Sequence, residues 1–186
     1  LDWARRLQAV AQSGLTYTRE EFERERYEEV RTIASEMMAA GADYDFQKVR
    51  DLFAGETGYA TPKFDGRGVV FQDGKVLMVR EVRDGGWTLP GGFADVGDTP
   101  GEAVVREVLE ETGYQVRATK LLALWDRTRH GHVPPRPFHL YKVFIRCEIV
   151  GGAPQSSHET ADPTFFGEHE IPPLSMGRCT PSQIAR

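Results

Sequence analysis

The sequence predicts an α+β protein in which a small all-helical region, residues 1–60, precedes a mixed α/β sandwich, residues 61–186. Three observations support this prediction. Apolar residues recur at helical spacing through the first region, strand-like runs follow Thr61-Pro62, and one well-capped helix interrupts those runs. A chain of 186 residues is long enough for one substantial domain with a small appendage.

The helical region begins with a segment in which Trp3, Leu7 and Val10 recur at helical spacing. Glycine is unfavourable inside a helix, so Gly14 is expected to end this first helix. A third, short helix is expected from about Asp45 to Phe53.

The second helix is the longest. Thr18, followed three residues later by Glu21, is a capping-box pattern that predicts its start, and Gly41 is expected to end it. Its apolar stripe comprises Phe22, Val30, Ile33, Ala34, Met37 and Met38. Because three helices form too thin a layer to bury a large core, we expect them to pack against the rest of the chain, against a second copy, or both. Met37 and Met38 are interpreted as core residues, with a dimer contact as the alternative.

Strands are predicted beyond Thr61-Pro62. Residues 67–72 and 75–81 read as two strands, and Asp73-Gly74 between them is typical of a type I′ hairpin. Further strand-like runs are expected at residues 115–126, 138–149 and about 163–167. Thr180 and Gln183 form a second capping-box pattern, which predicts a short helix near the end of the chain.

One helix is predicted between these strands, from about Thr99 to Thr112. Thr99 is expected to cap it, Pro100 suits the first helical position, and Gly113 suits the C-terminal stop. One face of this helix is apolar and is expected to pack against the sheet; that face comprises Val105, Val108, Leu109 and Thr112.

Three carboxylates project from the other face of this helix. Glu107, Glu110 and Glu111 are spaced i, i+3 and i+4. Like charges this close destabilise an isolated helix by roughly 0.3 kcal/mol per pair, which favours a compensating cation; a solvated acidic face is the alternative. Carboxylate oxygens on a rigid helix suit Mg²⁺ or Mn²⁺ better than zinc. Arg106 lies four residues from both Glu102 and Glu110, so it is expected to orient carboxylates through charge-assisted hydrogen bonds.

A glycine-rich loop, Leu89-Pro90-Gly91-Gly92-Phe93, precedes the helix and leaves backbone open to a metal or a phosphate. The loop and the helix together resemble the Nudix box, Gly-x5-Glu-x7-Arg-Glu-U-x-Glu-Glu-x-Gly-U, where U is a bulky apolar residue. The matching residues are Gly92, Asp98, Arg106, Glu107, Val108, Glu110, Glu111, Gly113 and Tyr114. Asp98 is the one departure, because it stands where the pattern has Glu. Its expected role is helix capping or a bond to Arg106.

The resemblance extends to one Nudix subgroup, whose members carry a helical N-terminal region and hydrolyse nucleoside diphosphates linked to another moiety. It rests on residues 1–60, residues 91–98 and His158-Glu159-Thr160 before Phe165-Phe166. The resemblance implies a Nudix αβα sandwich, a homodimer and divalent-metal-dependent cleavage of a diphosphate. CDP-choline is the favoured substrate, and ADP-ribose is the second choice.

The resemblance also implies roles for single residues. Glu107, Glu110 and Glu111 would bind Mg²⁺ or Mn²⁺, helped by the Gly91 carbonyl. The metal would neutralise the diphosphate and lower the pKa of a bound water. Glu107 is expected to orient or deprotonate that water.

Four further residues carry weaker signals. Glu159 is the alternative catalytic base, or else an ordinary exposed loop acid. Arg80, on the strand before the glycine loop, is expected to bind a substrate phosphate or to be simply solvated. His130 and His132 lie in a proline-rich loop that lacks the further ligands zinc needs, so they are interpreted as surface histidines.

Composition narrows the function classes. The chain has 23 Lys and Arg residues and 28 Asp and Glu residues, so its net charge is −5, and most of the excess negative charge lies in residues 1–60. This negative charge argues against nucleic acid as a partner. No apolar run approaches the roughly 20 residues that cross a bilayer, and the first residues lack the layout of a secretory signal. Cys147 and Cys179 are too few for a disulfide scaffold and are interpreted as passive, so a cytoplasmic setting is predicted.

Two other functions compete with the favoured one. Removal of pyrophosphate from the 5′ end of RNA also needs a diphosphate cut, but it should require a basic track for the strand. A non-catalytic sensor of nucleotide sugars should have lost its metal ligands and gained a basic DNA-reading module. The three helix carboxylates and the acidic first third of the chain argue against the sensor.

Overall fold

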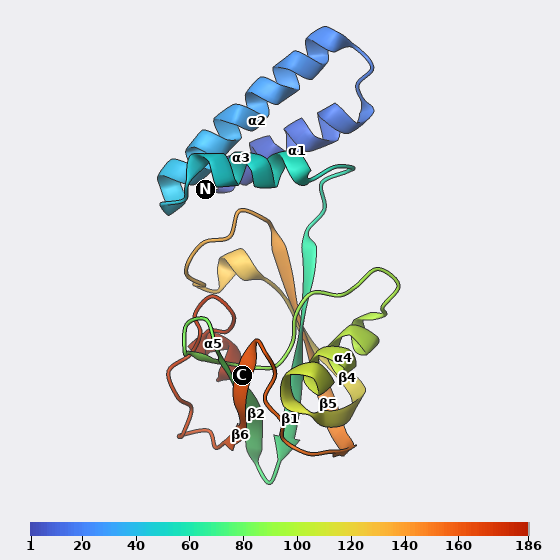
Figure 1. The fold of residues 1–186 in the computed structure, drawn as a ribbon, viewed down its shortest axis with the longest axis vertical. Helices are drawn as coiled ribbons and strands as arrows, with labels where there is room; N and C mark the ends of the chain where they lie inside the picture. Colours follow the sequence, from blue (N-terminus) through green and yellow to red (C-terminus); the bar gives the residue numbers. More distant parts are fainter. Residues whose placement is uncertain (186) are drawn as a thin grey trace. The chain divides into compact units, whose positions relative to one another are not determined.

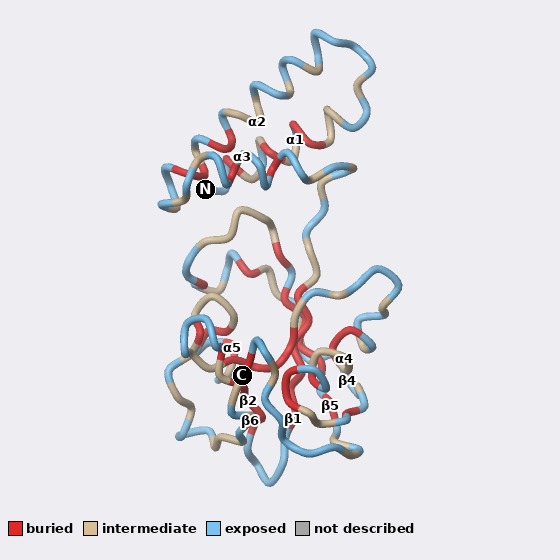
Figure 2. The backbone as a smooth tube through the Cα atoms, in the orientation of Figure 1, coloured by how far each residue is buried: buried red, intermediate tan, exposed pale blue. Residues whose placement is uncertain are grey.

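The computed structural model describes residues 1–185, which fall into two compact units (Figure 1). The first comprises Leu1–Pro62 together with Pro135–His139, and the second comprises Lys63–Pro134 and the chain from Leu140 onward. Buried residues gather inside each unit, as the red parts of the backbone tube show (Figure 2). None of the described helices is long and apolar enough to cross a membrane.

The first unit contains three helices, α1 (Asp2–Tyr17), α2 (Glu21–Ala42) and α3 (Phe46–Gly55). Its core comprises Ala4, Ala34, Met38, Val49 and Phe53. Asp45 caps α3, because its carboxylate accepts the Lys48 N–H at 2.9 Å. Residues 135–139 complete the unit: the Tyr44 hydroxyl donates to the Pro135 carbonyl at 2.6 Å, and Phe138 packs against the core.

The predicted end of α1 and the predicted cap of α2 are wrong. Gly14 does not end α1, because the Tyr27 ring of α2 packs where a Cβ at Gly14 would lie. Thr18 does not cap α2. Its N–H instead donates to the Gly14 carbonyl at 2.8 Å at the end of α1, and its hydroxyl donates to Glu23 at 2.7 Å. Glycine here serves close helix packing rather than helix termination.

The apolar stripe predicted for α2 is only partly buried. Met38 is wholly buried, which confirms it as a core residue and rules it out as a dimer contact. Phe22, by contrast, is 76% exposed and Ile33 is 41% exposed. The helix continues one residue past Gly41 to Ala42, and its C-cap is Asp43, whose φ of 53° is left-handed.

The second unit is built on a mixed sheet with strand order β3-β2-β1-β5-β4, and β6 also pairs with β2. Its strands are β1 (Lys63–Gln72), β2 (Lys75–Glu81), β3 (Trp87–Thr88), β4 (Tyr114–Asp126), β5 (Leu140–Gly152) and β6 (Thr160–Phe166). The hairpin at Asp73-Gly74 is confirmed, with φ of 51° and 74°. The strand expected from Phe138 begins at Leu140 instead, because Phe138 packs in the helical unit. β1 begins at Lys63, earlier than predicted, where it pairs in parallel with β5.

Helix α4 (Pro100–Thr112) covers one face of this sheet, and its predicted caps are confirmed. Thr99 and Glu102 form a capping box, and Gly113 adopts a left-handed φ of 75°. The buried side of α4 is formed by Ala103, Val104, Val108, Glu111 and Thr112. The prediction that Leu109 packs on the sheet is wrong, because Leu109 flanks this stripe and is 44% exposed.

Glycines on β1 allow α4 to lie close to the sheet. A Cβ at Gly68 would overlap the Val108 side chain, and one at Gly66 would lie 2.8 Å from Val104. The opposite face of the sheet carries a second apolar cluster that includes Val69, Met78, Leu89, Phe144 and Cys179. The short helix α5 (Pro181–Ile184) follows, and Gln183 accepts the Thr180 N–H at 3.0 Å, as its capping pattern predicts.

Candidate active site

The glycine loop is held against β1 by backbone hydrogen bonds. The Gly66 N–H donates to the Gly92 carbonyl and the Gly68 N–H to the Pro90 carbonyl, each at 2.8 Å. Gly91 lies between these two anchored residues with a φ of 140°, and a Cβ there would overlap the Gly66 carbonyl. Only glycine therefore fits at the centre of the loop.

Glu111 ties the helix to this loop. Its Oε2 accepts the Gly91 N–H at 2.8 Å, and the residue is 8% exposed. Burial raises the pKa of the Glu111 carboxyl to about 7, although the Arg67 charge and the Gly91 hydrogen bond act in the opposite direction. Glu107 also raises this pKa, because two carboxylates so close together disfavour a second charge.

Glu107 and Glu110 are less enclosed. The Glu107 carboxylate lies against Gly92, where a Cβ would sit 2.7 Å from its Oε2. Burial raises the pKa of Glu107, and a hydrogen bond from Arg106 opposes that shift. The Glu110 side chain is 58% exposed.

Arg106 is the cation at the centre of these acids. It donates to Glu107 at 2.8 Å and to Glu110 at 3.4 Å, and it bonds Asp98 at 3.2 Å. Asp98 therefore takes one of its two expected roles, the bond to Arg106. Glu102, the other acid expected to pair with Arg106, accepts instead from Thr99 at the start of the helix.

The donor set fits a hard divalent cation. Three carboxylates share one helix, and the buried Gly91 carbonyl accepts no hydrogen bond among residues 1–185. The raised pKa values of Glu107 and Glu111 mark carboxylates that a nearby cation would stabilise in the charged form. Among the described residues, no three acidic, histidine or cysteine groups already converge at metal-binding distances, and the Glu107 and Glu110 carboxylates instead accept hydrogen bonds from Arg106.

Arg80 and Glu159 come from elements other than α4: Arg80 lies on β2, and Glu159 directly precedes β6. Arg80, on β2, forms an ion pair with Asp162 of β6 at 2.6 Å, and both side chains are partly exposed. The Glu159 carboxylate is 64% exposed and lies 3.5 Å from His158. Its neighbour Thr160 donates to the Glu111 backbone carbonyl at 2.9 Å, which anchors the start of β6 to the end of α4.

A buried charge cluster went unrecognised in the sequence. Asp65 accepts from Arg67 at 2.8 Å and from Lys142 at 2.6 Å, and all three residues are buried. Sequence reasoning treated Arg67 only as the start of a strand. The alternation of Asp65 and Arg67 along one strand places both on one face, which was the available signal. Lys142 comes from β5, a distant part of the chain.

His132 is not a surface residue, which corrects the prediction. It is 7% exposed, its Nδ1 lies 3.0 Å from the Met176 carbonyl, and its Nε2 is buried without a hydrogen-bond partner in the described structure. Burial and the positive charges of Lys142 and Arg127 lower its pKa to about 4 from the ordinary 6.5, against opposing effects of Asp65 and the Met176 carbonyl.

The buried His132 makes stability depend on pH. Because the unfolded chain binds this proton below about pH 6.5 and the folded chain only near pH 4, the free energy of unfolding should fall by about 3 kcal/mol between these values. Urea unfolding of wild type and His132→Asn at pH 7 and pH 5 measures this effect. We expect the variant to lose most of the extra pH sensitivity; an identical pH dependence in both proteins would contradict the assignment.

The fold and the loop-helix unit together define the class of protein. A mixed sheet carries a glycine loop that is bonded to a carboxylate-bearing helix, and residues 62–182 match the family model described as "NUDIX domain". The chain belongs to the Nudix family, as the resemblance implied, and it is a pyrophosphohydrolase of that family. Residues 1–53 match a second model, "UDP-X-like, N-terminal oligomerisation domain", which confirms the helical subgroup.

Individual relatives resemble nearly the whole chain. The protein named "Putative ADP-ribose pyrophosphatase YjhB" from Bacillus subtilis is 45% identical over 185 residues, which are 100% of this chain and 88% of the relative. The crystal structure of a UDP-X diphosphatase is 36% identical, covers 98% of this chain and 89% of its own, and superposes with a TM-score of 0.64. An ADP-ribose pyrophosphatase structure from Streptococcus suis is 42% identical over 67% of this chain and 88% of its own, with a TM-score of 0.61.

Proposed function

We propose that this chain hydrolyses the diphosphate bond of a nucleoside diphosphate linked to another moiety, with Mg²⁺ or Mn²⁺ held by Glu107, Glu110, Glu111 and the Gly91 carbonyl. The main support for the proposal is the hydrogen bond between the glycine loop and α4. Glu111 accepts the Gly91 N–H at 2.8 Å, and the Gly91 carbonyl is left available. The names of the relatives favour ADP-ribose ahead of CDP-choline, which reverses the order expected from the sequence.

In this proposal each site residue has a separate role. A bound Mg²⁺ or Mn²⁺ supplies charge neutralisation at the diphosphate and activates a water. Glu107, kept in place by Arg106 at 2.8 Å, orients or deprotonates that water. Glu159 is the alternative base, because its carboxylate is exposed next to the anchored start of β6. Arg80 is partly exposed and would bind a substrate phosphate.

A substrate panel tests this function. ADP-ribose, CDP-choline, a UDP-sugar and 5′-triphosphate RNA are each incubated with Mg²⁺ or Mn²⁺, and products are separated by chromatography. AMP with ribose 5-phosphate supports the proposed order, whereas CMP with phosphocholine restores CDP-choline to first place. Cleavage of the RNA alone would favour the RNA pyrophosphohydrolase, and inertness across the panel would favour the nucleotide-sugar sensor.

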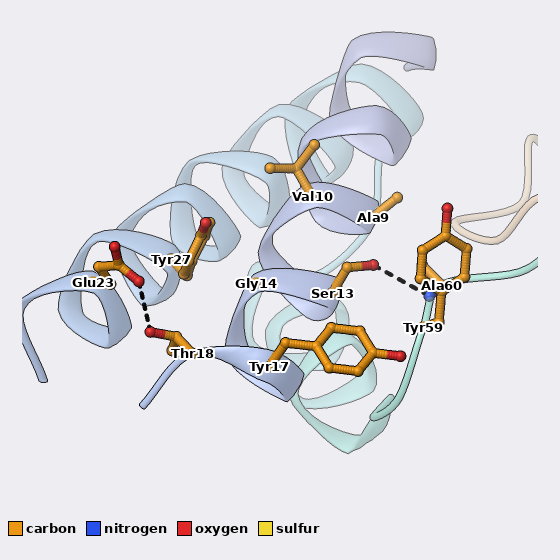
Figure 3. Close-up of a pocket in the computed structure, with 10 residues that line it drawn as sticks. All are labelled: Ala9, Val10, Ser13, Gly14, Tyr17, Thr18, Glu23, Tyr27, Tyr59 and Ala60. Carbon is orange, nitrogen blue, oxygen red and sulfur yellow. Dashed lines mark hydrogen bonds between the residues drawn. The ribbon is translucent and has the colours of Figure 1, made fainter. Parts of the chain in front are cut away.

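We also propose that the helical unit forms a homodimer through α1. Trp3, Val10 and Tyr17 are seven residues apart and 70%, 57% and 67% exposed, so they form one apolar line along the helix. Val10, Tyr17 and Tyr59 line an open groove of about 620 Å³ in this unit (Figure 3). The match to an oligomerisation domain supports a second copy of the chain as the occupant.

Substituting one residue of this line should separate the dimer. Val10→Lys places a charge in the proposed interface, and lysine is a good helix former, so we expect at least about tenfold weaker self-association with the helix intact. Light scattering after size exclusion measures the mass. Leu52→Lys, an exposed apolar residue of α3, is the matched control and should leave the mass unchanged. A monomeric wild type, or a dimer that survives Val10→Lys, would refute this interface.

A further inference from the structure

Arg67 lies at the centre of a fully buried network beneath the glycine loop. It and Asp65 share one face of β1, and Lys142 on β5 pairs directly with Asp65 in the parallel register. Arg67 Nε donates to one Asp65 oxygen at 2.8 Å, and Lys142 Nζ donates to the other at 2.6 Å. Arg67 is 1% exposed and Lys142 is 0% exposed, so neither side chain can touch substrate in this arrangement.

Arg67 has a second bond that leaves the cluster. Its Nη1 donates to the backbone carbonyl of Leu89 at 3.1 Å, and Leu89 is the first residue of the glycine loop. The only other donor to this carbonyl among residues 1–185 is the neighbouring Thr88 hydroxyl, at a longer 3.2 Å. Arg67 therefore sets the direction of the peptide that enters the loop.

The next backbone carbonyls along the loop alternate between bonded and available. Those of Pro90 and Gly92 accept hydrogen bonds from β1, so the Gly91 carbonyl between them is the one that stays available. A shift of the Leu89 peptide would change which loop carbonyls are bonded to β1 and which one stays available. A buried network with an excess positive charge contributes little stability compared with well-packed apolar side chains, so a geometric role accounts better for its presence.

We propose that Arg67 is a positioning residue, which through the Leu89 carbonyl fixes the glycine loop so that Gly91 faces the carboxylates of α4. This inference rests on the proposed function, in which the Gly91 carbonyl and those carboxylates hold the metal.

Two matched variants test the positioning role. Arg67→Met and Lys142→Met each remove one buried positive charge, and each leaves a neutral ion pair with Asp65, so both are expected to fold. Only Arg67→Met removes the guanidinium donor from the Leu89 carbonyl, which keeps just the Thr88 hydroxyl. We expect it to weaken Mn²⁺ binding by about 10- to 100-fold, measured by titration with electron paramagnetic resonance, and to speed amide exchange at Gly91 and Gly92. Lys142→Met should stay within about twofold of wild type.

The pH dependence of Mn²⁺ binding separates positioning from electrostatics. Loss of a buried positive charge should tighten the binding of a cation to ionised carboxylates, but it also removes the Arg67 charge that lowers the pKa of Glu111, and a protonated Glu111 binds a cation less well. Titrations at pH 7 and pH 8.5 distinguish the two effects, because weakening by protonation of Glu111 shrinks at the higher pH, whereas weakening by a displaced loop persists. Unchanged or tighter binding, weakening that disappears at pH 8.5, or equal weakening by both variants, would overturn the inference. Arg67→Lys is the second variant if Arg67→Met fails to fold. Lysine keeps the positive charge but lacks the planar guanidinium that reaches both Asp65 and the Leu89 carbonyl, so amide exchange at Gly91 and Gly92 should still accelerate. Unchanged amide exchange in this variant would refute the positioning role of Arg67.

The same measurements separate this inference from the proposed function. A wild type that binds no Mn²⁺ defeats the proposed metal site. The exchange of Gly91 and Gly92 in metal-free Arg67→Met still reports whether Arg67 holds the loop.

Discussion

Glu110→Gln should lower turnover at least about 100-fold while leaving the fold intact. The substitution removes a negative oxygen from the proposed metal site with almost no change in volume. Its cost in stability should be small, within about 0.5 kcal/mol, because the side chain is 58% exposed and its bond to Arg106 is long at 3.4 Å. Steady-state kinetics with saturating Mn²⁺, together with urea unfolding, measures both effects.

Glu148→Gln is the control for this experiment. Glu148 is also an exposed carboxylate paired with an arginine, Arg117 at 2.9 Å, but it lies on β5. We expect its turnover to match wild type. Turnover of Glu110→Gln near the wild-type level would mean that the metal is bound elsewhere.

Gly91→Ala should damage both the fold and the activity. The added Cβ would overlap the Gly66 carbonyl and lie 2.9 Å from the Arg67 Cα, so the loop must leave β1. The φ of 140° adds strain for any residue with a side chain. We expect a loss of about 2–3 kcal/mol in the free energy of unfolding and a fall in turnover of about 100-fold, because displacement by about 1 Å can cost that much in rate.

Gly97→Ala separates backbone strain from steric overlap. Gly97 also has a positive φ, 106°, but nothing lies within 4 Å of its absent Cβ. This variant should lose only about 1 kcal/mol and keep most of its activity. Equal losses in the two variants would show that strain, rather than contact with β1, explains the glycine at position 91.

Local signals predicted the elements whose causes are themselves local. Helix α4 follows from Thr99, Pro100 and Gly113, which act within one turn of its ends. The hairpin at Asp73-Gly74 likewise depends on backbone preferences at two adjacent residues. Both predictions are confirmed to the residue or nearly so.

The failed predictions involve partners that are distant in the sequence. The sequence predicts that a helix ends at Gly14, but in the structure the Tyr27 ring packs beside Gly14 and the helix continues. His132 reads as a surface residue until the Met176 carbonyl lies 3.0 Å from its ring. Leu109 fits the apolar face by periodicity, but the orientation of α4 on β1 leaves it 44% exposed. In each case tertiary packing overrides a local preference.

The candidate site shows the same division. The amino-acid sequence alone predicted Arg106 and the carboxylates of α4 as candidate site residues, because their spacing on one helix requires no knowledge of the fold. Only the tertiary structure revealed that Glu111 bonds to Gly91 and that Arg67 holds Leu89, because β1, the loop and the helix meet there from separate parts of the chain. Helical periodicity acts over a few residues, whereas sheet register and burial depend on which distant segments pair.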